Sequence, residues 1–403
     1  MNKYLPILIF FILADVVADN SILRVFGAHS SSSAFMLSMG MLILQMVAAP
    51  IQAGFSDFYC RKKSLIVALT VSLISLLFLF YAMSPGSLSI IILAFVALMK
   101  GTFGNTVPLA WGALADTQEK NLRFSLALST GAYAVGYMVL AISSMYGAKK
   151  ISGYSWLSLE GMPIIIFVVC ILCCAFFFRD VRDKKMRFEI HNKKIAFLRL
   201  AHSEFKALLQ DVYQRSTRLG LLAYFLWATS QYSVLILLTD FQTQYIDTVI
   251  VMMLGYLIGV AILGFCKKIK DEKIIRSAFV ITISSLSLYF VFINFTKNIH
   301  LLISVCYFFY TIGNAFLSPS ILSLFSKDRE LHKQGQGFGL IVSADSGGFL
   351  FASIVAILFG FFKISFNYIV LFSFIAFVIS WIPYSIYEKI RKDADRIENG
   401  RSG

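Results

Sequence analysis

Long apolar runs separated by short polar connectors recur from one end of the sequence to the other. Residues 64–83 and 366–387 are apolar on every face, whereas a strand of a membrane barrel alternates between apolar and polar positions. A membrane-spanning helix needs about 20 predominantly apolar residues. A window of that length predicts twelve spans, at 4–26, 34–55, 64–83, 88–113, 124–146, 161–178, 218–239, 246–266, 274–295, 299–325, 337–361 and 365–387.

The composition agrees with a membrane protein and excludes a soluble fold. Hydrophobic residues make up 58% of the chain, the mean hydropathy is +0.76 and charged residues are only 14%, against roughly 25% in soluble domains. The six cysteines lie in or beside apolar runs, with no histidine at metal-ligand spacing. We expect them to pack in the spans, and we expect no disulfide, metal or cofactor.

The distribution of positive charge predicts the orientation of the chain. With the spans above, 30 of the 36 Lys and Arg residues fall on the side of the N-terminus and five on the other side. The positive-inside rule then predicts a multi-pass protein of the inner (plasma) membrane with both termini in the cytoplasm. The net charge of +14 is therefore mainly a signal of topology, and basic residues scattered over every loop do not favour nucleic-acid binding.

One long polar stretch divides the spans into six and six. We predict an N-terminal bundle at 1–178, a partly helical linker at 179–217, a C-terminal bundle at 218–388 and a tail at 389–403. The predicted fold is thus all-α, with twelve transmembrane helices in two six-helix bundles.

The two halves also share a pattern. Gly104-Asn105, followed by Pro108, recurs 209 positions later as Gly313-Asn314, followed by Pro319. Gly54 and Gly264 each precede a charged turn, and they lie 210 positions apart. Such repeats indicate a duplicated unit with a binding site between pseudo-symmetric halves. The two prolines mark positions where helices can bend.

The connector after the second predicted span carries a recognisable motif. It contains Gly54, Asp57 and the basic run that begins at Arg61, with Cys60 where glycine is usual. This pattern resembles the signature of the major facilitator superfamily of secondary transporters. The resemblance implies a conformational latch in which this connector pairs with an acidic residue at the end of the fourth span, here Asp116. The alternative is that the basic run only anchors the chain by the positive-inside rule.

Four ionisable residues lie within predicted spans and away from their ends: Asp15, Asp19, Lys100 and Asp345. Each costs about 2.5–3.5 kcal/mol at a span centre, so each is a candidate functional residue. Asp15 and Asp19 share one helix face and repel one another, which favours protonation of one of them. Residues 100–104 also resemble a fourth-helix motif of the superfamily associated with proton coupling. We therefore expect proton coupling or substrate binding at these four residues; the alternative is a static salt bridge between helices.

The resemblance implies that these spans surround one central aqueous cavity. Polar and aromatic residues on them are further candidates for lining a substrate cavity: Asn20, Asn105, Trp111, Tyr133, Trp227, Gln231, Tyr232 and Asn314.

Together these features predict a secondary active transporter that works by alternating access. We expect a monomer in the lipid bilayer that moves a small polar, zwitterionic or cationic solute by proton-coupled symport. A proton-coupled exporter of drugs or metabolites is the alternative, although residues 129–136 lack the Gly-Pro pair usual in drug antiporters of the superfamily. No catalytic triad, HExxH or phosphate-binding loop is present in the sequence, so we do not expect an enzyme.

Overall fold

The structure is a computed structural model of the chain. It describes the residues in the ranges 4–28, 32–58, 60–82, 90–117, 121–150, 161–179, 214–240, 246–292, 299–328, 334–362 and 366–401. Most of the predicted linker, 180–213, therefore lies outside the described residues.

The described residues form thirteen α-helices. They are α1 (Leu5–Ala28), α2 (Ser32–Phe58), α3 (Arg61–Ala82), α4 (Ile90–Phe103), α5 (Thr106–Thr117), α6 (Leu122–Lys150), α7 (Gly161–Phe176), α10 (Arg215–Asp240), α11 (Ile246–Phe265), α12 (Asp271–Phe292), α13 (Ile299–Lys327), α14 (Gln334–Phe361) and α15 (Phe366–Arg401).

These helices correspond to the twelve predicted spans, because α4 and α5 are two pieces of the fourth span. Eight segments of the described chain, with α4 and α5 taken together, are long and apolar enough to cross a membrane by length and composition. The helices α1, α6, α7 and α10 pack beside them and complete the set. The prediction of an all-α protein with twelve spans is confirmed.

Two span predictions differ from the structure. The fourth span is interrupted at Gly104 and Asn105, while Pro319 lies inside an unbroken α13. The last helix continues to Arg401, well beyond the predicted end at 387. Its extension is held by ion pairs, including one between Lys392 and Glu388 one helical turn apart at 2.7 Å.

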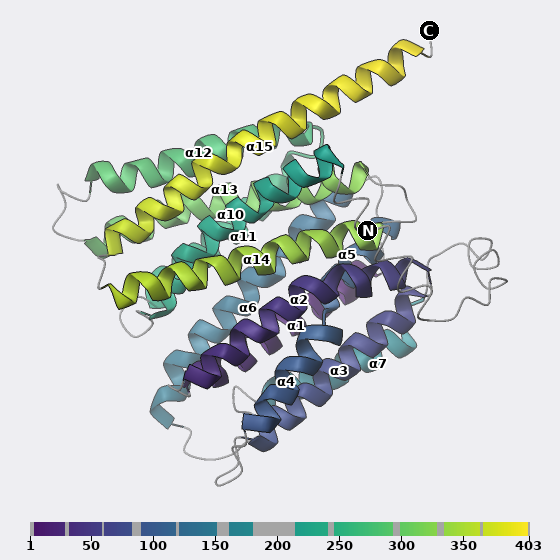
Figure 1. The fold of residues 1–403 in the computed structure, drawn as a ribbon, viewed down its shortest axis with the longest axis vertical. Coiled ribbons are helices and arrows are strands. Elements are labelled where there is room, and N and C mark those ends of the chain that lie inside the picture. The colour runs from purple at the N-terminus through teal and green to yellow at the C-terminus, as the bar shows by residue number, and fades with distance from the viewer. Residues whose placement is uncertain are drawn as a thin grey trace.

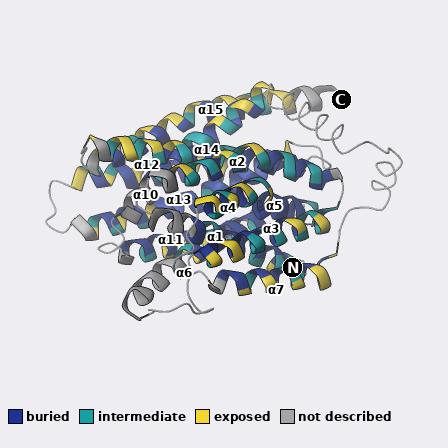
Figure 2. Cartoon of the chain, turned by 60° about the horizontal axis from the view of Figure 1, so that its bottom comes forward, coloured by how far each residue is buried: buried dark blue, intermediate teal, exposed yellow. Residues whose placement is uncertain are grey.

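The outer surface of the molecule is apolar. Figure 2 shows exposed positions along the outward sides of helices such as α4, α12 and α15, with buried positions facing inward. Large hydrophobic side chains there are open, for example Ile91 at 75% and Val280 at 65% exposure. A soluble protein would bury such side chains, whereas lipid tails solvate them, so the molecule is built for a bilayer.

The helices form two halves, α1–α7 and α10–α15, which lie side by side in Figure 1. The halves meet mainly where α2 packs on α14 and where α6 packs on α11, with further contacts of α5 to α14 and of α6 to α13. At the first crossing a Cβ atom added to Gly339 would overlap the backbone of Pro50 and Ala49. Glycine thus permits α14 to approach α2 at backbone distance.

Candidate functional site

Lys100 lies at the centre of a buried charge cluster within the first half. Its side chain is fully buried, and its ammonium group donates a hydrogen bond to Asp15 and lies 3.0 Å from an oxygen of Asp19. Asp15 and Asp19 project from one face of α1, one helical turn apart. The structure therefore brings together three of the four ionisable residues that the sequence places in spans.

The break in the fourth span supplies the remaining partners of this cluster. The ammonium of Lys100 donates to the carbonyl oxygen of Gly104 at 2.9 Å, and the backbone N–H of Thr106 donates to Asp15 at 3.2 Å. The carbonyl end of α4 thus faces a cation and the N–H end of α5 faces an anion, as the helix dipoles require. Backbone groups released by the break are satisfied by the charges beside it.

The two carboxylates of the cluster have different environments. Asp15 is only 3% exposed and is held by Lys100 and Thr106, whereas the side chain of Asp19 is 30% exposed. Besides the Lys100 ion pair, Asp19 accepts a hydrogen bond from Gln45 of α2 at 3.4 Å, a long distance for such a bond. Asp19 is therefore the more accessible and more weakly held of the two.

A second group of charges joins the two halves near the end of α2. Arg61 is 1% exposed; its guanidinium lies 2.9 Å from Asp116 and 2.5 Å from Asp57. Asp57 also accepts hydrogen bonds from the backbone N–H groups of Gly335 at 3.0 Å and Gln336 at 2.8 Å, in the first turn of α14. We call this group of residues the first latch. We call the end of the molecule where it lies the latch end.

The local structure of the first latch differs from the expected loop. The motif residue Gly54 is buried within α2, which continues to Phe58, so the connector to α3 is shorter than the sequence suggests. The ion pair between Asp57 and Arg61 therefore spans the junction of two helices instead of a single helical turn. Gly112 of α5 makes room for it, because a Cβ there would lie 2.7 Å from the Arg61 guanidinium.

A second latch, which the sequence analysis missed, joins the halves at α6 and α12. Arg123 donates to Asp271 at 2.6 Å and to the carbonyl oxygens of Cys266 and Ile269 at 2.7 Å each. Asp271 also pairs with Lys327 at 2.6 Å and is 4% exposed. We call this group the second latch.

The second latch mirrors the first with opposite charge. Asp271 lies 210 positions after Arg61, the same offset that separates Gly54 from Gly264. In each half a buried ion at the start of a helix pairs with an opposite charge near the end of the following span, Asp116 in one case and Lys327 in the other. The repeat offset of 210 positions could have located this site from the sequence. A search for identical residues at that offset misses it, because the charge is reversed.

A cavity of about 80 Å³ lies between the two halves. Its wall comes from α5 and α6 on one side and from α10, α11, α13 and α14 on the other. Aromatic and hydroxyl side chains dominate this central cavity. Its lining residues are Trp111, Thr130, Tyr133, Ala134, Tyr137, Tyr224, Trp227, Gln231, Tyr232, Met252, Met253, Tyr256, Tyr310, Thr311, Asn314, Ser318 and Asp345.

Asp345 is the acidic residue of this cavity wall. It accepts a hydrogen bond of 2.7 Å from the hydroxyl of Tyr232, and the described residues show no ion pair to it. On the same wall the indole N–H of Trp227 donates to the side-chain oxygen of Asn314 at 3.0 Å. Polar contacts thus orient several wall residues around a single carboxylate.

Most of the predicted cavity residues line this cavity, and one described residue, Asn105, does not. Trp111, Tyr133, Trp227, Gln231, Tyr232 and Asn314 belong to its wall. The side chain of Asn20 lies outside the described residues, and Asn105 instead donates to the Gly101 carbonyl at 3.2 Å beside the helix break.

The charge cluster and the cavity are also separate. None of Asp15, Asp19 and Lys100 lines the cavity that contains Asp345, so the four ionisable residues occupy two places. Lys100 is buried at the break, where α1, α4 and α5 meet, and therefore does not face the interface between the halves.

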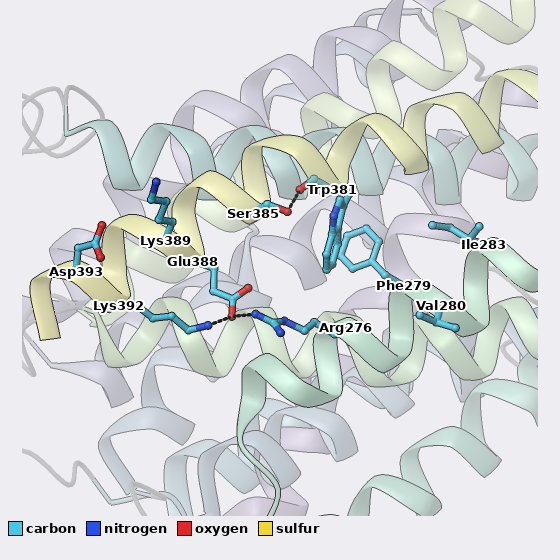
Figure 3. A pocket seen from close by; sticks show the side chains of 10 residues that line it. All are labelled: Arg276, Phe279, Val280, Ile283, Trp381, Ser385, Glu388, Lys389, Lys392 and Asp393. Carbon is cyan, nitrogen blue, oxygen red and sulfur yellow. Dashed lines mark hydrogen bonds and ion pairs between the residues drawn. The ribbon is translucent and has the colours of Figure 1, made fainter. Parts of the chain in front are cut away.

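A larger hollow of about 590 Å³ lies on the outside of the second half, between α12 and α15. Figure 3 shows Arg276 and Lys392 directed at Glu388, at the polar end of this groove, and Phe279 and Trp381 in edge-to-face contact near its apolar end. Both of its helices belong to one half, so it does not lie between the two parts that an alternating-access carrier must move.

One short helix connects the three functional regions of the first half. The first residue of α5, Thr106, bonds to Asp15 in the charge cluster; Trp111 lines the cavity; Asp116 binds Arg61 in the first latch. The helix has 12 residues, a length of about 18 Å. One helix therefore extends from the charge cluster past the cavity to the first latch.

The comparisons with known proteins agree with this architecture. The family model described as Major Facilitator Superfamily matches residues 5–353. The chain therefore belongs to the major facilitator superfamily: it is a multi-pass membrane transporter and not an enzyme. No curated protein matches the sequence.

Solved structures share the fold over nearly the whole chain at low identity. The human organic anion transporter MFSD10 (TETRAN) has a TM-score of 0.69 and 14% identity and covers 96% of this chain and 99% of its own. The E. coli fucose:proton symporter FucP has a TM-score of 0.66 and 15% identity, and the match covers 95% of this chain and 98% of FucP. A bacterial homologue of the iron transporter ferroportin, in an outward-facing state with soaked iron, has a TM-score of 0.69 and 14% identity. The match covers 96% of this chain and 100% of the homologue.

Proposed function

We propose that this chain is a proton-coupled symporter that imports a small polar, zwitterionic or cationic solute across the inner membrane by alternating access. The main support is the position of α5. It bonds to the charge cluster at Thr106, contributes Trp111 to the cavity wall and ends in the first latch at Asp116. A coupled carrier needs such a connection, because ion binding must change the preference between its two conformations.

The proton step follows from the charges of the cluster. With both carboxylates ionised and Lys100 protonated, the cluster carries one net negative charge in a buried site. One proton neutralises it, and we place that proton on Asp19, because protonation there gives up fewer contacts than at Asp15 and because its partly exposed carboxylate can be reached. Protonation of Asp19 releases one partner of Lys100, which keeps its bonds to the Gly104 carbonyl at the break and to Asp15, the acceptor of the Thr106 N–H at the start of α5.

The latches supply the conformational part of the proposal. Asp57 and Arg123 both bind groups of the second half at the latch end, so separation of the halves there must break both sets of contacts. The positive-inside count supports placing this end and both termini in the cytoplasm. Neutralisation of the charge cluster, transmitted through α5 to Asp116, then loosens the first latch and favours opening toward the cytoplasm.

The cavity supports a solute that carries positive charge. A carboxylate in a low-dielectric site attracts a cation and repels an anion. We therefore do not propose an organic anion, the solute named for the human transporter MFSD10, as the substrate of this chain. Its described cavity wall contains Asp345 and no Lys, Arg or His.

Uptake into proteoliposomes under an imposed inward proton gradient tests the function. The panel consists of labelled choline, glycine, a neutral hexose and a small dicarboxylate. We expect the gradient to drive accumulation of a cationic or zwitterionic member in wild type, and Asp19→Asn to abolish it. Asp393→Asn, at an exposed position on α15, is the matched control and leaves it unchanged. Equal gradient-driven accumulation in Asp19→Asn, or outward movement alone in wild type, would overturn the proposal.

A further inference from the structure

The wall of the central cavity contains many aromatic rings and one carboxylate. Tyr224, Trp227 and Tyr232 come from α10, while Trp111 and Tyr133 face them from the first half. The ring centroids of Tyr224 and Trp227 are 4.8 Å apart, and those of Trp111 and Tyr133 are 6.5 Å apart. Both halves therefore contribute aromatic faces to the same small space.

Aromatic faces carry a negative quadrupole and attract cations, most strongly where water is excluded. Asp345 adds a full negative charge to this wall, and the described residues give it a hydrogen bond from the hydroxyl of Tyr232 but no cation. A partly buried carboxylate without a cationic partner is costly. A ligand that brings the missing positive charge into the cavity would remove that cost.

The type of cation can be narrowed by the ligands that the wall offers. A metal ion or a primary ammonium needs several oxygen ligands to replace its lost water. A substituted ammonium group, whose charge is surrounded by methyl or methylene groups, has few or no N–H donors to satisfy and fits against rings. The wall is rich in rings and contains a single carboxylate, and several of its other oxygen atoms already have protein partners: the hydroxyls of Thr130 and Thr311 donate to backbone carbonyls, and the side-chain oxygen of Asn314 accepts from Trp227. This set favours the substituted ammonium.

The size of the cavity is consistent with a closed state of such a site. About 80 Å³ is small against the roughly 300–1,000 Å³ of typical ligand sites. Because α6 and α10 line it from opposite halves, separation of the halves widens it. Closure of the halves then brings the rings of both sides onto the cation and excludes water.

We propose that the central cavity selects a monovalent organic cation with a substituted ammonium group, held between the aromatic rings and paired with Asp345. The inference rests on the proposed function in that it names the solute class of the same carrier. A binding measurement tests it first, because binding can be measured without transport.

Binding of choline to the purified protein, compared with its neutral isostere 3,3-dimethylbutan-1-ol, tests this inference. The two probes share shape and hydroxyl group and differ only in the charge at the quaternary centre. We expect choline to quench or shift the tryptophan fluorescence of wild type and to raise its apparent melting temperature, and the isostere to do neither at the same concentrations.

Variants at the carboxylate separate charge from shape. Asp345→Asn should weaken choline binding by about tenfold or more, since truncation of one partner of a buried charge pair costs at least that factor. Asp345→Glu should retain the preference for choline over the isostere, which controls for misfolding of the Asn variant. Asp393→Asn is the surface control and should bind as wild type does.

The outcomes separate this inference from the proposed function. Equal binding of choline and isostere, unchanged choline binding in Asp345→Asn, or tighter binding of glycine, the hexose or the dicarboxylate would overturn the cation assignment. Choline binding with the predicted selectivity but without proton-driven uptake would uphold the assignment and overturn proton-coupled transport. Proton-driven uptake of a solute without an ammonium group would uphold proton-coupled transport and overturn the cation assignment.

Discussion

Asp57 and Gln336 lie 279 positions apart in the chain, and the carboxylate of the first accepts a 2.8 Å hydrogen bond from the backbone N–H of the second. The end of α2 is thereby tied to the first turn of α14 in the other half. The same carboxylate is 2.5 Å from Arg61, which reaches Asp116 on α5. One acidic side chain thus takes part both in closing the latch end and in the network that leads to the charge cluster.

Asp57→Asn should favour separation of the halves at the latch end. Hydrogen bonds to a charged group contribute about 1.5–3 kcal/mol each, so loss of the charge should shift the equilibrium by about tenfold or more. The measurement is the distance distribution between spin labels at Lys63→Cys and Lys268→Cys, two exposed positions in opposite halves, in a variant without native cysteines. An unchanged distribution would show that Asp57 does not hold this end closed.

Arg123→Ala should have an effect of the same direction through the second latch. Arg123 and Asp57 act at different helix pairs, α6 with α12 and α2 with α14. Both contacts oppose the same opening, so their free energies should add in the double variant Asp57→Asn/Arg123→Ala. The spin-label distances report it, with Lys389→Ala, which lies in the outer groove, as the control. A double variant no more open than Asp57→Asn alone would argue against two independent latches.

Gly339→Ala should prevent full closure at the α2–α14 crossing. The added methyl group would overlap the backbone of Pro50 and Ala49, which cannot move as a side chain could. Gly40→Ala, on α2, is the matched control because, among the described residues and apart from its own helix backbone and chain neighbours, no heavy atom lies within 4 Å of its added Cβ. The expected result is a longer distance at the latch end and a lower apparent melting temperature for Gly339→Ala alone. Similar behaviour of the two variants would contradict the close approach.

Lys100→Met should destabilise the protein strongly, and Asp15→Asn should restore stability in the double variant. Removal of Lys100 leaves Asp15 as a buried charge without its cation, at a cost of about 3–5 kcal/mol, whereas the double variant keeps only the carboxylate of Asp19, whose side chain is 30% exposed. Apparent melting temperatures of the single and double variants in detergent measure this. No recovery in the double variant would show that the pair does not act as a unit.

Part of this structure could be predicted from the sequence, because hydropathy and motif spacing are local signals. The twelve spans follow from apolar runs, and the proximity of Arg61 and Asp116 follows from the motif. The break at Gly104 could not be located this way. Neither Gly104 nor Asn105 requires a break; it is stabilised by Lys100 and by Asp15 of another helix, which only the folded structure brings near.

The cavity wall and the second latch were hidden for different reasons. Aromatic residues make up 15% of the chain, so Tyr224, Tyr256 and Tyr310 carry no sequence signal that separates them from lipid-facing rings. Asp271 lies at the repeat offset from Arg61 but has the opposite charge. The duplication preserves the position of a buried ion pair, not the identity of its residues.

The central claim is that Asp19 takes up the proton that moves with the solute. Its most direct test compares two fluxes in the same proteoliposomes, using labelled choline and, if choline fails, the panel solute that wild type accumulates. Counterflow exchanges solute without net proton movement, while solute-driven acidification of a pyranine-loaded lumen reports coupled entry. We predict that wild type shows both fluxes and that Asp19→Asn retains counterflow but loses acidification. Acidification by Asp19→Asn at the wild-type rate would contradict the account.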